Sequence, residues 1–98
     1  MLSFKTPIVL KPNYTMSLEN FNNMLWFHTD VYRWSKQIKH DFIKDLNTVQ
    51  ELITIPLAAL VEDNNTKLMK FATLIGFTPV RNITGDDGKT YNILSRSL

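Results

Sequence analysis

The sequence has no cysteine, only three glycines and no long uninterrupted apolar run. Without cysteine, disulfide bridges and thiolate metal sites are excluded. Without an apolar run of about 20 residues, an ordinary membrane-spanning helix is excluded as well. The first residues do not combine a charged segment with a long apolar one, as a secretion signal would. We therefore expect a cytoplasmic protein.

Charge of either sign is sparse, with 11 basic and 9 acidic residues and a formal net charge of +2. So small an excess does not by itself indicate a nucleic-acid partner. Hydrophobic residues make up 44% of the 98 residues, which is typical of a folded chain with one modest core. We expect residues 1–98 to form a single domain.

Chemistry-bearing motifs are also few. His28 and His40 stand twelve positions apart without a cluster of carboxylates around them, so no metal site is expected. No phosphate-binding glycine loop, nucleophile elbow or triad-like order occurs. The sequence thus offers no catalytic residue by motif.

Residues 30–46 show the clearest helical pattern, with Thr29 or Asp30 as the expected N-cap. An apolar stripe recurs every three or four residues and consists of Val31, Trp34, Ile38, Phe42 and Leu46. The other sides carry five basic or titratable side chains, Arg33, Lys36, Lys39, His40 and Lys44. These form either a solvated face or a surface for anions or an acidic partner, since helix starts also attract anions.

The N-terminal third contains shorter signals. Residues 7–10 are predicted as a strand, residues 11–14 as a turn and residues 25–29 as another strand. Between them, residues 17–20 resemble the start of a short helix, with Ser17 as its cap and Asn20 at the position where a capping box has Glu.

The C-terminal half is more legible. Residues 53–61 are predicted as a buried strand, followed by a helix that Asn64 or Asn65 caps. The apolar face of this helix is expected to consist of Leu68, Phe71, Ala72 and Ile75. Gly76 stands where a helix end needs a residue tolerant of positive φ. An Asp-Gly step at residues 87–88 then predicts a hairpin between two strand-like runs.

The order of strand, Asn, amphipathic helix and Gly76-Phe77, with Asn65 and Gly76 eleven positions apart, resembles the C-terminal half of the GNAT superfamily of N-acetyltransferases. The resemblance covers roughly residues 25–98, and its most specific part is residues 57–77. Within the superfamily, the order looks most like the small GNAT-like proteins of tailed bacteriophages. The resemblance implies an α+β fold, a truncated mixed sheet packed by two main helices and ending in an antiparallel hairpin.

In the family, a Gln/Arg-x-x-Gly-x-Gly/Ala loop before the long helix lets backbone amides approach the pyrophosphate of acetyl-CoA. Here Arg33 takes the first position, but the two small-residue positions fall on Lys36 and Ile38. The family's frequent tyrosine general acid falls on Ala72. If a cofactor binds, the resemblance implies acetyl-CoA, and the contacts would be Phe27, His28, Thr29, Arg33, Lys36 and Asn65.

Chemically capable residues also have a structural interpretation. His28 could polarise a carbonyl or act as a base, but a histidine flanked by aromatics is more often structural. Glu62 or Asp63 could deprotonate an amine through water, but such residues more often support a turn. Asn65 is more often a cap than a ligand.

Three functions remain open. The resemblance, together with the missing glycines and tyrosine, favours a phage-type GNAT-like protein with no acetyl transfer and no cofactor, which binds a host enzyme or defence complex in the host cytoplasm. Its partner-binding residues would be Arg33, Lys36, Lys39, His40 and Lys44, and a homodimer through the truncated side of the sheet is a further expectation. The alternatives are a minimal acetyl-CoA-dependent N-acetyltransferase and a nucleic-acid-binding protein that uses helix 30–46.

Overall fold

The computed structural model describes residues 4–97. The chain divides into two compact units, which are described separately. The first unit contains residues 4–57 with residue 97, and the second unit contains residues 58–96. The expectation of a single domain stays a prediction. Among the described residues, no helix is both long and apolar enough to cross a membrane.

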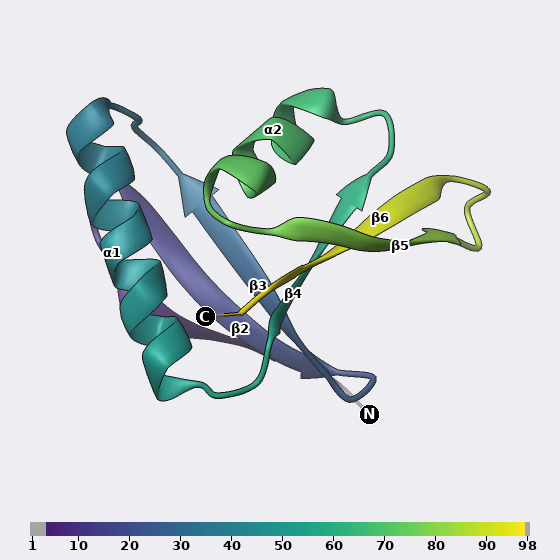
Figure 1. Cartoon of the computed structure of the whole chain (residues 1–98), viewed down its shortest axis with the longest axis horizontal. Coiled ribbons are helices and arrows are strands. Elements are labelled where there is room, and N and C mark those ends of the chain that lie inside the picture. The colour runs from purple at the N-terminus through teal and green to yellow at the C-terminus, as the bar shows by residue number, and fades with distance from the viewer. Residues whose placement is uncertain (1–3, 98) are drawn as a thin grey trace. The chain divides into compact units, whose positions relative to one another are not determined.

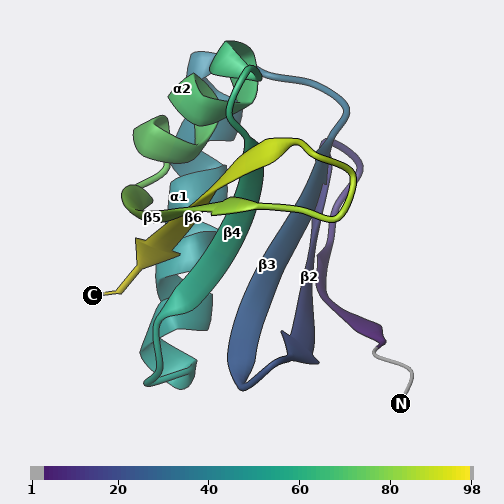
Figure 2. The same cartoon turned by 90° about the vertical axis from the view of Figure 1, so that its right-hand side faces the viewer.

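The first unit begins with three antiparallel strands, β1 (Lys5–Leu10), β2 (Tyr14–Phe21) and β3 (Met24–Val31), in that order. Asn22 and Asn23 have φ values of 53° and 60°, the left-handed backbone that a two-residue hairpin turn requires. Figure 2 shows the resulting pair of β2 and β3 side by side. The predicted strands at residues 7–10 and 25–29 are therefore confirmed, each with longer bounds.

The short helix expected at residues 17–20 is wrong, because these residues lie in β2. Burial alternates along this strand: Tyr14, Met16 and Leu18 are buried, and the residues between them are partly exposed. That period of two is the signature of a strand with one covered face. Ser17 and Asn20 have the spacing of a helix cap, but no helix follows them because both lie in β2.

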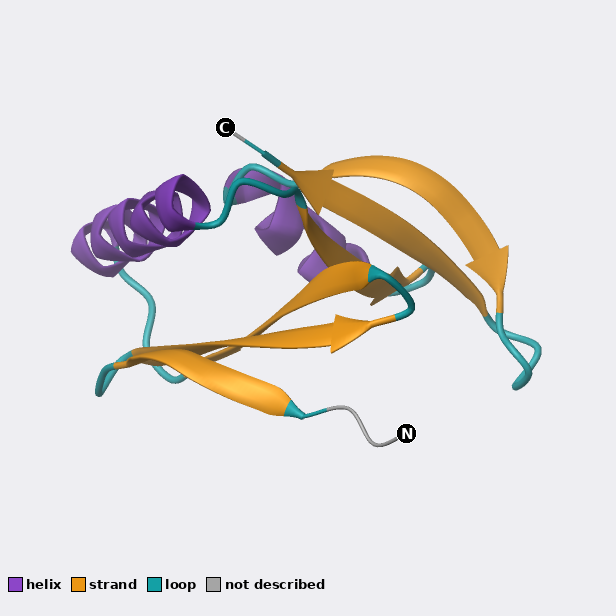
Figure 3. Ribbon diagram, turned by 90° about the horizontal axis from the view of Figure 1, so that it is seen from below, coloured by secondary structure: helices purple, strands orange, loops and turns teal. Residues whose placement is uncertain are grey.

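Helix α1 spans Lys36–Leu52 and covers one face of this sheet (Figure 3). It begins six positions later than predicted, because β3 continues to Val31, which pairs with Tyr14. Ser35 is the N-cap, and its side chain accepts a hydrogen bond from the Ile38 N–H at 3.1 Å. The expected caps Thr29 and Asp30 both lie in β3.

Aromatic rings join α1 to the sheet. Phe42 is 0% exposed, and its ring centroid lies 4.9 Å from that of Tyr14, 6.5 Å from that of Phe27 and 5.8 Å from that of Trp34. Val49 and Gln50, beyond the predicted helix, are also buried. Val31 and Trp34, which were expected in the helix stripe, precede the helix and are partly exposed.

A polar cluster of Lys11, Tyr14 and Asp45 also links α1 to the sheet. The Tyr14 hydroxyl donates to Asp45 Oδ2 at 2.6 Å, and Lys11 Nζ lies 2.6 Å from the same oxygen. Burial and the hydrogen bond to Asp45 raise the pKa of Tyr14 well above its usual value. Burial alone would raise the pKa of Asp45, but the hydrogen bonds from Lys11 and Tyr14 outweigh it and hold this pKa below its usual value.

We expect Asp45→Asn to destabilise the protein by about 1–2 kcal/mol at neutral pH, because it removes the charge from these hydrogen bonds. A carboxylate with a depressed folded-state pKa stabilises the fold above its unfolded-state pKa of about 4, and this stabilisation is lost as the pH falls through the folded-state value. The difference between wild type and variant should therefore shrink on acidification. Urea unfolding at neutral pH and at several acidic pH values measures it, and a difference that stays constant would contradict the argument.

The second unit contains β4 (Leu57–Glu62) from its second residue onward, α2 (Thr66–Leu74), β5 (Thr78–Thr84) and β6 (Thr90–Arg96), with the strand order β4-β6-β5. The predicted strand at residues 53–61 begins later, because α1 runs to Leu52. β5 and β6 form the predicted antiparallel hairpin (Figure 2). The described residues form two helices beside these strands, one in each unit (Figure 1), and the predicted α+β class is confirmed.

The predicted cap of α2 is confirmed at Asn65, whose side-chain oxygen accepts from the Leu68 N–H at 3.1 Å. Gly76 follows the helix with φ of 101°, as predicted. Ala72 and Ile75 are buried, but Leu68 is 40% exposed and does not belong to the core face. The short helix thus covers a narrower stripe than its sequence suggested.

Candidate functional site

Arg33 lies in the segment between β3 and α1, directly before the helix. Backbone hydrogen bonds hold this segment to the β1–β2 turn: the Tyr32 and Arg33 N–H groups donate to the Asn13 carbonyl at 2.8 and 3.3 Å. Lys36 is the first residue of α1, and both cationic side chains are exposed. Arg33 and Lys36 therefore both lie at the start of α1, one just before the helix and one as its first residue.

The amides of this helix start are partly occupied. The Ile38 N–H donates to Ser35 Oγ, and the Lys39 N–H donates to the Ser35 carbonyl. Within residues 4–97, the N–H groups of Lys36 and Gln37 have no such partner. An anion at this end of α1 would find the Lys36 and Gln37 amides as donors of the first turn, because the serine cap has taken that of Ile38.

The three expected cofactor contacts on β3 do not point to a common place. Phe27 is buried against Phe42, and Thr29 Oγ1 donates to the Thr15 carbonyl at 2.6 Å. The His28 side chain, 35% exposed, has its Nε2 2.8 Å from Glu19 Oε1. Each side chain already has a contact within the first unit.

The sequence pattern does not reveal Glu19 as the partner of His28, because it predicts a helix at residues 17–20. Ser17 and His28 are registered opposite each other on β2 and β3, so Glu19 is a diagonal neighbour of His28. Side chains on the same face at this offset are within reach of one another. Two alternating strands joined by a tight turn were the signal that could have revealed the pair.

The remaining candidates lie in the second unit and take part in its structure. Asn65 caps α2. Glu62 forms an ion pair with Lys89 at 3.6 Å, and Asp63 Oδ1 accepts from Asn92 Nδ2 at 3.1 Å. Ala72, where the resemblance places the tyrosine of the GNAT family, is 5% exposed. A hydroxyl donor is therefore missing at that place.

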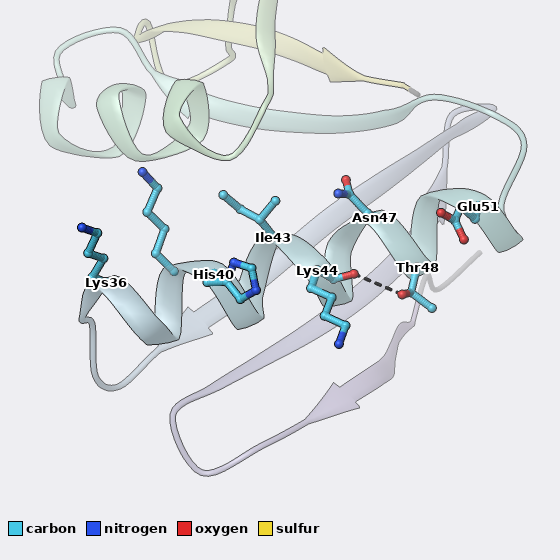
Figure 4. A pocket seen from close by; sticks show the side chains of 8 residues that line it. Lys36, His40, Ile43, Lys44, Asn47, Thr48 and Glu51 are labelled. Atoms are coloured by element: carbon cyan, nitrogen blue, oxygen red, sulfur yellow. Dashed lines mark hydrogen bonds between the residues drawn. The ribbon is translucent and has the colours of Figure 1, made fainter.

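Four of the five predicted partner-binding residues come together on α1. They line a shallow hollow of about 680 Å³ along the helix (Figure 4). Its residues are Lys36, Lys39, His40, Ile43, Lys44, Asn47, Thr48 and Glu51. Arg33 precedes the helix and does not line this hollow. In the part of the chain that the structure describes, no group of three or more His, Cys, Asp or Glu side chains could hold a metal ion.

No protein-family model and no curated protein matches the sequence. Among solved structures, the chain is similar to one from Bordetella pertussis that is assigned to the GnaT acetyltransferase family, with a TM-score of 0.65 and 15% sequence identity. The similarity covers 87% of this chain but only 57% of that chain. At this identity the likeness concerns the fold alone. The chain therefore has a GNAT-like fold, over little more than half the length of that acetyltransferase.

Proposed function

We propose that this GNAT-like protein binds a protein partner and does not transfer acetyl groups. The observation that carries the proposal is the start of α1. Lys36 and Ile38 stand where the family has small residues, and the Ser35 side chain already bonds one of the amides. Since a Cβ and a longer side chain obstruct close approach of a pyrophosphate to the backbone, this helix start is poorly suited to CoA.

The position of Ala72 supports the same conclusion. An acetyltransferase that releases CoA as a thiol benefits from a proton donor near the leaving sulfur. Alanine cannot donate a proton, and this alanine is buried in the second unit. Neither Glu62 nor Asp63 offers an obvious replacement, because both are general bases at best and are engaged with Lys89 and Asn92.

A minimal acetyltransferase is the second candidate. The observation in its favour is the helix start itself: within residues 4–97 the N–H groups of Lys36 and Gln37 have no hydrogen-bond acceptor, Arg33 precedes the helix, and Lys36 is its first residue. Backbone amides at a helix start together with nearby cations attract phosphate groups. In this alternative Arg33 and Lys36 would replace the glycines of the family by supplying charge.

Neither outer strand is suited to adding a strand from a partner. In β1, Pro7 lacks a backbone N–H, and the pairing shifts by one residue between Pro7 and Val9. In β5, Pro79 is followed by the same kind of shift before Arg81. Prolines and bulges at sheet edges prevent edge-to-edge association. The homodimer expected through the truncated side is therefore disfavoured, and the partner should dock on another surface.

The nature of the partner rests on the resemblance to small phage proteins. Under that resemblance, the partner is a host enzyme or a defence complex, and the protein meets it in the host cytoplasm. Capture of partners from a host extract tests this part of the proposal. The charge-reversed variants Lys39→Glu and Lys44→Glu serve as controls.

Isothermal titration with acetyl-CoA and CoA tests the loss of cofactor binding. We expect no binding tighter than about 1 mM, which corresponds to roughly 4 kcal/mol of binding free energy. A double substitution, Lys36→Gly with Ile38→Ala, restores the small residues and should improve binding if obstruction is the cause. Micromolar binding by the unmodified protein that Arg33→Ala abolishes would contradict the proposal and favour the acetyltransferase.

A further inference from the structure

The cations of α1 line one flank, whereas two of its acidic side chains are engaged elsewhere and Glu51 shares the flank with the cations. The acidic side chains Asp41 and Asp45 are engaged within the first unit: Asp41 accepts from Gln37 Nε2 at 3.1 Å, and Asp45 binds Tyr14 and Lys11. The cations Lys36, Lys39, His40 and Lys44 all line the hollow. Within residues 4–97, no ion pair involves any of these four. This flank is therefore a concentrated positive surface on a chain whose net charge is only +2.

The hollow has a floor and a rim. Lys39, Ile43 and Asn47, spaced four residues apart, are half-buried and form the floor. The exposed rim follows the helix, with its residues seen in sequence in Figure 4, and consists of Lys36, His40, Lys44, Thr48 and Glu51. From Lys36 to Glu51 the hollow extends about 22 Å at the rise of an α-helix. A spacing of four residues on the floor suits side chains of a second helix laid along it.

The chemistry changes along this length. The cations extend from Lys36 past Ile43 at the middle to Lys44, and the remaining length presents Asn47, Thr48 and finally the carboxylate of Glu51. A complementary occupant is acidic at one end, aliphatic in the middle, and basic or amide-bearing at the other end. Complementary charge of this kind sets both orientation and choice of partner.

We propose, building on the protein-binding function above, that this hollow binds an amphipathic helical segment of the partner protein with that pattern. Its acidic side chains extend from one end to the centre, against Lys36, His40 and Lys44, and its central aliphatic side chain lies against Ile43. Helix-on-helix recognition of this type reads side chains at intervals of three and four residues. The charges and the central isoleucine of the hollow thus specify the segment of the partner that binds: a helix with acidic and aliphatic side chains.

Nucleic acid fits this surface less well. A phosphate backbone carries the same negative charge along its whole length, so a strand that followed the hollow would meet the carboxylate of Glu51 after the cations. Ile43 at the centre offers a contact to an aliphatic side chain and none to phosphate. A second copy of this chain also fits less well, because each copy would bring four cations and one carboxylate to the interface.

Fluorescence anisotropy with labelled synthetic peptides tests the proposal on the full chain. The probe is a helical peptide with glutamates at one end, leucines at the centre and lysine at the other end. A scrambled peptide of the same composition and a single-stranded oligonucleotide of equal net charge are the comparisons. We expect the patterned peptide to bind at least about tenfold more tightly than either comparison, with weaker binding at high salt.

Charge reversal locates the binding surface. Lys39→Glu on the floor and Lys44→Glu on the rim should each weaken binding of the patterned peptide by about tenfold or more. Lys67→Glu makes the same charge change at an exposed residue of α2 and should alter binding by less than about twofold. Urea unfolding of each variant separates loss of binding from loss of fold.

Four results would overturn the inference. These are equal binding of the scrambled peptide, tighter binding of the oligonucleotide, an equal effect of Lys67→Glu, and a dimer in solution that Lys44→Glu dissociates. Titration with CoA keeps the two proposals apart. Cofactor binding and turnover with the peptide site intact would refute only the non-catalytic function, whereas absence of both CoA and peptide binding would refute only the assignment of this hollow.

Discussion

Replacing Phe42 with alanine is expected to destabilise the protein by about 3–5 kcal/mol, as is typical for a large aromatic removed from a core. Phe42 is fully buried, and three aromatic rings, those of Tyr14, Phe27 and Trp34, contact it. The substitution removes apolar burial and leaves a cavity where α1 meets the sheet. Since small domains are stable by only about 5–15 kcal/mol, the loss should be visible as a large shift of the urea midpoint.

Trp34 provides a matched control. Its ring contacts the same Phe42 ring at 5.8 Å, but it is 40% exposed and precedes the helix. Trp34→Ala should therefore cost only about 1–2 kcal/mol, because water can fill the space that it leaves. If Phe42→Ala costs no more than Trp34→Ala, then Phe42 is not the centre of the packing between α1 and the sheet.

Features set by local chemistry could be predicted from the sequence. The Asn65 cap, the positive φ of Gly76 and the β5–β6 hairpin each depend on a few adjacent residues whose side chains or flexibility determine the backbone. Such features can be predicted from sequence because the neighbouring residues alone make one backbone conformation lower in free energy than its alternatives. They were also the features that carried the resemblance to the GNAT fold.

The start of α1 could not be predicted because a long-range pairing decides it. Val31 and Trp34 continue the helical spacing of the stripe, and Thr29, Asp30 and Ser35 are all capping residue types. The pairing of Val31 with Tyr14, 17 residues earlier in the chain, keeps this stretch in β3. Tertiary pairing overrides local preference in this way wherever two patterns overlap.

The grouping of the four cations that line the hollow could be predicted even though the start of α1 could not. Lys36, His40 and Lys44 lie four positions apart and Lys39 lies three positions after Lys36, so they share one flank of any helix that contains them all. Moving the helix start left them together but removed Arg33 from the helix. The Glu19–His28 pair was missed for the opposite reason, since it exists only once β2 and β3 are placed in register.

Replacing Gly76 with alanine is expected to destabilise the protein by about 2–4 kcal/mol, because two separate costs coincide. The φ of 101° lies outside the range that alanine adopts without strain, which costs about 1–2 kcal/mol. An added Cβ would also lie 3.0 Å from Arg96 Nε. That nitrogen donates to the Ile75 carbonyl at 2.8 Å from a buried side chain, so moving it weakens a charged hydrogen bond.

Gly88 separates the two costs. It also has a positive φ, 80°, but a Cβ there would meet no atom within 4 Å. Gly88→Ala should therefore show the backbone strain alone, at about 1–2 kcal/mol. A double-mutant cycle then isolates the contact with the guanidinium, because Gly76→Ala should cost less in an Arg96→Ala background than in the wild type. If Gly76→Ala destabilises both backgrounds equally, the Arg96 side chain moves aside without loss of stability. The positive φ of Gly76 then accounts for the whole cost of the substitution.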